Sequence, residues 1–97
     1  MTENNKNQYL PDYPQVPGEI LLEILEERGM SQAQLVERTG RKRKTINQII
    51  KGITPITPET ALQLERALGV PARFWNSLEG NYREDLARLE KRHGNRF

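Results

Sequence analysis

The sequence has no cysteine and a single histidine, His93, among its 97 residues. Disulfide bonds and thiolate metal sites are therefore excluded, and His93 alone cannot build a zinc site. A His-Glu-x-x-His motif is also absent, and no pair of carboxylates lies on an apolar face with a base nearby. We therefore expect no metal, no cofactor and no enzymatic activity.

Long apolar segments are absent as well. No run of about 18 apolar residues exists, so no segment is expected to span a membrane. Residues 1–8 lack the apolar stretch that a secretory signal needs. Together with the missing cysteines, these absences lead us to expect a cytoplasmic protein.

Charge is distributed unevenly along the chain, although the net charge is only +2. Residues 1–40 carry three cations against seven anions, whereas residues 53–97 carry seven cations and six anions. Residues 41–52 carry five cations and no anion. Such a concentrated cationic patch is typical of a protein that binds a polyanion. A solvated basic loop would have the same composition, so the position of the patch in the fold has to decide.

Apolar residues recur at helical spacing and never alternate as in a strand, so we predict an all-α protein with five helices. The predicted helices begin at Pro17, cover residues 32–38, cover residues 43–50, begin at Pro58 and begin at Pro71. Ser31 and Thr57 are suitable N-cap residues for the second and fourth of these helices. The expected organisation is an irregular arm over residues 1–16, a domain over 17–79, and a helical extension with a tail over 80–97.

The last predicted helix carries a stripe of apolar side chains. The stripe consists of Phe74, Trp75, Leu78, Tyr82, Leu86 and Leu89. Its first three members are expected in the core, whereas its last three lie beyond the reach of so small a core. Glu84 and Arg88 form a favourable i,i+4 pair beside them, and Gly80 weakens the helix and permits a bend. We therefore predict that the last three contact a second copy or another partner.

The second and third predicted helices are joined by the turn Thr39-Gly40-Arg41-Lys42. Two short helices joined by a tight turn with glycine are what a helix-turn-helix motif requires, and its second helix enters the major groove of DNA. The densest basic run, residues 41–44, falls at the start of this second helix, where the helix dipole and free N–H groups favour phosphate. Charge and helix pattern therefore converge on a DNA-binding motif over residues 31–52.

The outward side chains of this motif divide by chemistry. Amides pair with adenine, lysine reaches the acceptors of guanine, and the threonine methyl meets thymine. The base-edge candidates are Lys44, Thr45, Asn47 and Gln48. Phosphate contacts position the protein without reading sequence, and the candidates for them are Arg41, Lys42, Arg43 and Lys51, with Gln32 and Thr54 as neutral helpers. A solvated helix face is the alternative for any one of these residues.

The blocks Ser31–Gly40 and Lys44–Gly52 resemble the Cro/C1 (Xre) family of lambda-repressor-like helix-turn-helix domains. Residues 17–21, 56–62 and 68–75 further resemble its HigA/VapI branch, the antitoxins of plasmid-maintenance modules. The resemblance covers about residues 17–82 and implies that Gln32 and Arg43 grip phosphate. Two positions depart from the pattern, because the family usually has an apolar residue at position 41 and a Ser or Thr cap at position 42.

The resemblance implies a homodimeric repressor that covers a palindromic operator in its own promoter. As a HigA-like antitoxin it would also neutralise a RelE/HigB-like toxin by direct contact. A second branch with nearly the same blocks consists of regulators whose N-terminal domain precedes an ImmA/IrrE-like metallopeptidase domain. A protein-interaction module with vestigial DNA binding is a further alternative.

Overall fold

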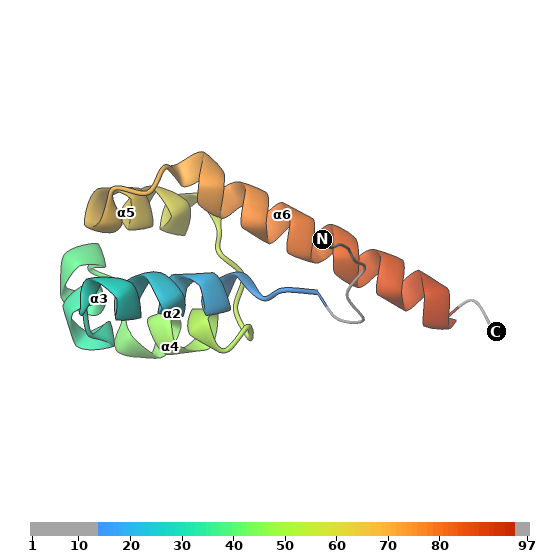
Figure 1. Ribbon diagram of the computed structural model, residues 1–97, viewed down its shortest axis with the longest axis horizontal. Coiled ribbons are helices and arrows are strands. Elements are labelled where there is room, and N and C mark those ends of the chain that lie inside the picture. The colour runs from blue at the N-terminus through green and yellow to red at the C-terminus, as the bar shows by residue number, and fades with distance from the viewer. Residues whose placement is uncertain (1–13, 95–97) are drawn as a thin grey trace, which may run out of the picture.

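Five α-helices and no strand are present across residues 14–94, the part of the chain that the computed structural model describes (Figure 1). They are α2 (Pro17–Arg28), α3 (Gln32–Thr39), α4 (Arg43–Ile50), α5 (Pro58–Leu68) and α6 (Ala72–Gly94). The all-α, five-helix prediction is confirmed. Most of the expected N-terminal arm, residues 1–13, lies outside the described residues, as do residues 95–97 and the side chains of 92–94.

The helix ends follow local chemistry. Pro17 occupies the first position of α2, and Gly29 ends the helix in the left-handed conformation with φ 65°. The Ser31 hydroxyl accepts the Gln34 N–H at 3.1 Å, while the Gln34 side chain accepts the Ser31 N–H at 2.8 Å, which is a reciprocal capping box. Thr57 caps α5 through its hydroxyl, which accepts the Thr60 N–H.

One buried apolar cluster holds the five helices together. Its members are Leu21, Leu25, Leu35, Ile46, Ile49, Ile56, Ala61, Leu64, Leu68 and Trp75. Every helix contributes to this cluster. Among the described residues, α4 packs mainly on α2 and α3, and its other side carries the exposed residues Arg43 and Lys44. The Arg28 guanidinium donates a hydrogen bond to the carbonyl oxygen of Leu68 and so links the last residues of α2 and α5.

The predicted core residues of α6 behave differently from one another. Trp75 is fully buried and Leu78 packs against the core, as expected. The prediction for Phe74 is wrong in part, because this side chain is 38% exposed and touches Trp75 edge-on, with 5.2 Å between ring centroids. Adjacent helix positions point about 100° apart, so Phe74 cannot share the buried direction of Trp75.

Helix α6 is long and continues without a break through Gly80. Figure 1 shows that it starts beside α5 and extends away from the other four helices. The boundary expected between residues 79 and 80 therefore falls inside a single helix. The predicted pair of Glu84 and Arg88 forms, with 2.5 Å between carboxylate and guanidinium. No helix in the described part of the chain combines the length and apolar composition that a membrane crossing requires.

Candidate nucleic-acid interface

Helix α4 has one buried side and one exposed side. Ile46 and Ile49 are buried, whereas Arg43 and Lys44 at its start and Lys51 just beyond its end are exposed. This division follows the amphipathic spacing of the sequence. The result is a short helix that presents cationic and amide groups to solvent on the surface of the domain.

The packing of α2 sets the position of α4. The backbone of α2 at Gly18 lies directly against the backbone of α4 at Ile49 and Ile50. Only a residue without a side chain permits so close an approach. Helix α3 also packs on α4. The two helices α2 and α3 together therefore fix the position and orientation of α4 on the domain surface.

The four base-edge candidates all belong to α4, but they differ in exposure. Lys44 is exposed, whereas Thr45, Asn47 and Gln48 are half-buried. The side-chain oxygen of Gln48 accepts a hydrogen bond from the Thr54 hydroxyl at 3.2 Å. Because this oxygen is held from the protein side, the Gln48 amide NH₂ remains available to donate outward.

The phosphate candidates fall into two groups. Lys42, Arg43 and Lys51 are exposed at the two ends of α4. Gln32 is half-buried at the first position of α3, and Thr54 is half-buried and directed at Gln48. The structure therefore gives Thr54 a role in orienting a base-edge candidate, which the sequence pattern did not reveal.

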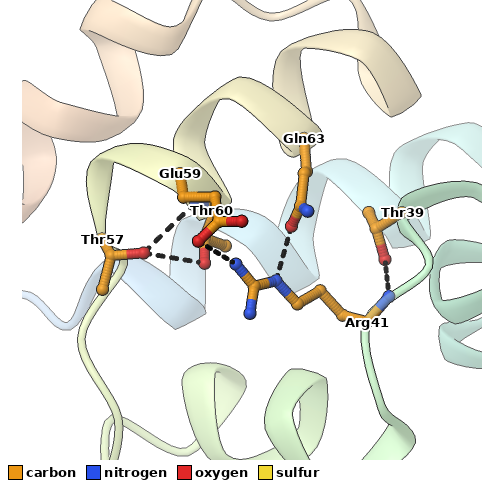
Figure 2. A network of polar contacts seen from close by, with 6 residues as sticks. All are labelled: Thr39, Arg41, Thr57, Glu59, Thr60 and Gln63. Carbon is orange, nitrogen blue, oxygen red and sulfur yellow. Dashed lines mark hydrogen bonds and ion pairs between the residues drawn. The ribbon is translucent and has the colours of Figure 1, made fainter.

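Arg41 is placed differently from the other cations. Figure 2 shows its side chain pointing toward α5, where its Nε donates to the Gln63 side-chain oxygen. Its Nη2 lies 3.4 Å from the carboxylate of Glu59, and its backbone N–H donates to the Thr39 hydroxyl at 3.2 Å. The Arg41 side chain therefore contacts α5, and its predicted phosphate contact stays a prediction.

Sequence reasoning did not identify Gln63 and Glu59 as partners of the motif. Both lie in α5, and Gln63 is 22 residues from Arg41. One sequence feature could have indicated that Arg41 has such partners. Position 41 carries an arginine where the resembling family usually has an apolar residue. A charged side chain at a packing position needs polar partners, and α5 provides them.

The predicted partner-contact residues lie on the projecting part of α6. Tyr82, Leu86 and Leu89 are half-buried and do not belong to the core cluster. The guanidinium of Arg83 lies 5.1 Å from the ring centroid of Tyr82. Nothing in these contacts identifies a partner, so the contact with a second copy stays a prediction.

Comparison with known proteins agrees with this geometry. A helix-turn-helix family pattern matches residues 21–75. Virulence-associated protein I of Dichelobacter nodosus is 34% identical over 76 residues, which cover 77% of this chain and 70% of that protein.

Two solved structures of antitoxins are also similar. An addiction module antidote protein of the HigA family from Coxiella burnetii is 32% identical with a TM-score of 0.74, covering 87% of this chain and 90% of that one. The antitoxin HigA of Pseudomonas aeruginosa, solved with the higBA promoter, is 32% identical with a TM-score of 0.73, covering 86% and 89%. The chain belongs to the Cro/C1 (Xre) family of helix-turn-helix proteins, which bind DNA and are not enzymes, and its similarity within that family is to the HigA-type antitoxins.

Proposed function

We propose that the protein is a sequence-specific repressor that binds double-stranded DNA through α4 and acts as a HigA-like antitoxin. The observation that carries this proposal is the outer face of α4, where exposed cations flank half-buried amide side chains. The similar Pseudomonas aeruginosa antitoxin was solved with a promoter, which supports DNA as the partner.

The two kinds of side chain on α4 have separate tasks. Lys42, Arg43 and Lys51 neutralise phosphates at both ends of the helix and so place it in the groove. Lys44 and the half-buried amide NH₂ of Gln48 then face the base edges, where each donates to a base acceptor and so discriminates against bases that lack one. Affinity thus depends mostly on the first set and sequence preference on the second.

We further propose that a homodimer covers a palindromic operator. Each protomer has a single α4, and two symmetry-related copies are needed to read two half-sites. The half-buried stripe of Tyr82, Leu86 and Leu89 on the projecting helix α6 is the candidate contact between the copies. The same helix is available to a RelE/HigB-like toxin, and a small basic reading frame beside the gene would support that partner.

The test of DNA binding uses a duplex that spans the protein's own promoter and a random duplex of equal length. A dimer with three exposed cations per protomer on phosphates neutralises about six phosphates, so affinity for the promoter falls about 10³-fold between about 50 mM and about 200 mM salt. Fluorescence anisotropy over this range measures the slope. Equal affinity for the random duplex would reject sequence-specific repression.

Alanine variants at Arg43 and Gln48 separate the two tasks. Arg43→Ala is expected to weaken binding to every duplex and to reduce the salt slope by about 0.9 for each phosphate that is no longer neutralised. Gln48→Ala is expected to reduce the preference for the promoter roughly tenfold while leaving the random duplex nearly unaffected. Competition titrations give both ratios. An unchanged preference in Gln48→Ala would contradict the assigned base contact.

A further inference from the structure

Arg41 connects the turn of the helix-turn-helix motif to a helix outside the motif. Its Nε donates to the side-chain oxygen of Gln63, and its Nη2 lies 3.4 Å from a carboxylate oxygen of Glu59 (Figure 2). The Arg41 side chain is only 26% exposed, whereas that of Glu59 is 77% exposed. The guanidinium is therefore partly withdrawn from solvent and already has acceptors on α5.

The start of α4 has little other support. Its N-cap residue, Lys42, makes no side-chain cap hydrogen bond. Helix α4 packs mainly on α2 and α3, whereas α5 packs mainly on α6 and α3. The turn before α4 is held by the Thr39 hydroxyl, which accepts the Arg41 N–H and donates to the carbonyl oxygen of Leu35 at 2.8 Å. The Arg41 side chain adds the link from this turn to α5.

We propose that Arg41 is a positioning residue for the reading of DNA rather than a phosphate contact. By joining the turn to Gln63 and Glu59 on α5, Arg41 fixes the position of the start of α4. This position determines how far Lys44 and Gln48 reach toward the bases. Its positive charge also compensates the exposed carboxylate of Glu59 on α5. This inference rests on the proposed DNA binding and concerns only how α4 is oriented for it.

The experiment compares Arg41→Met, Gln63→Met and the double variant with the wild-type chain on the promoter and random duplexes. Methionine keeps most of the side-chain volume and removes the hydrogen bonds. Gln63→Met removes one charge-assisted hydrogen bond and is expected to lower promoter affinity roughly fivefold, with a smaller effect on the random duplex. Arg41→Met also removes the ion pair with Glu59 and is expected to lower promoter affinity at least as much. The double variant is expected to bind no more weakly than the weaker single variant, since both changes remove the same link.

The salt slope distinguishes positioning from phosphate contact. Arg41→Met is expected to leave the slope unchanged, whereas the neighbouring control Lys42→Met reduces it by about 0.9 for each phosphate that this lysine neutralises in the wild type. A reduced slope in Arg41→Met, together with wild-type binding by Gln63→Met, would overturn the proposal. If Arg41→Met does not fold, Gln63→Met decides alone through its promoter preference.

Thermal unfolding of each variant is followed by circular dichroism, and DNA binding is measured below the unfolding range. A lowered Tm with an unchanged ratio of promoter to random affinity would assign Arg41 to stability alone and would also overturn the proposal. The wild-type chain is measured first. Failure of the wild type to prefer the promoter rejects the proposed function, whereas an unchanged ratio in the variants rejects only the role of Arg41.

Discussion

Replacing Gly18 by alanine is expected to destabilise the domain by about 3 kcal/mol and to lower its Tm by about 15 °C. Gly18 is buried in the first turn of α2. An added Cβ would lie 2.1 Å from the carbonyl oxygen of Ile49 and 2.5 Å from the Cα of Ile50. These are backbone atoms of α4, so the clash is relieved only if one helix moves relative to the other.

Gly80→Ala is the matched control for this prediction, because Gly80 also lies within a helix. No atom outside its own helix lies within 4 Å of an added Cβ at Gly80. Alanine should stabilise α6 there by about 1 kcal/mol, since it has the higher helix propensity. Thermal unfolding of both variants measures the difference. A Tm for Gly18→Ala at or above the wild-type value would show that α2 and α4 are not in this close contact.

The effect of Gly18→Ala extends to DNA binding. A shift of α2 against α4 moves the exposed cations of α4 relative to Gln32, which lies at the start of α3. Contacts from two helices must match the fixed spacing of phosphates and base edges. We therefore expect promoter affinity to fall even at a temperature where Gly18→Ala remains folded.

Trp75→Ala is expected to destabilise the domain by about 4 kcal/mol and to lower Tm by roughly 20 °C. The Trp75 side chain is fully buried among the residues of the core cluster, and its indole N–H donates to the carbonyl oxygen of Val70 at 3.2 Å. Alanine leaves a large cavity and removes the donor for this carbonyl. Urea unfolding, analysed for midpoint and slope, measures the loss of free energy.

The neighbouring aromatic residue is the control. Phe74 is exposed at 38% and contacts Trp75 only edge-on, so Phe74→Ala is expected to lower the free energy of unfolding by about 1 kcal/mol. The two variants remove aromatic rings at adjacent positions of the same helix and differ mainly in burial. Equal losses from both would contradict the difference in burial between Trp75 and Phe74.

The cations of the motif are not equivalent. Residues 41–52 carry five of them, and the exposed ones are Lys42, Arg43, Lys44 and Lys51. Arg41 faces Glu59, so its charge is compensated within the protein. The charge available to DNA is therefore smaller than the composition of the segment indicates, and the salt dependence should reflect this smaller number.

The amino-acid sequence by itself determined the helices and their ends. Pro17, Gly29, Ser31 and Thr57 each act on backbone groups within about four residues, so their effects are readable without a tertiary structure. The amphipathic pattern of α4 is likewise local, and it correctly separated the buried isoleucines from the exposed cations. The charge of the motif and the resemblance of its flanks then pointed to the family.

Only the tertiary structure decided which of these residues meet across the fold. The sequence made no prediction for Gly18, whose need to lack a side chain arises from the backbone of α4 packed against it. Phe74 belongs by sequence to the apolar stripe of α6, but the packing of this helix buries the adjacent Trp75 and leaves Phe74 38% exposed. Arg41 belonged to the basic run by sequence, yet its partners lie on α5. Contacts between segments far apart in the chain depend on how the helices pack, and helical periodicity carries no information about those partners.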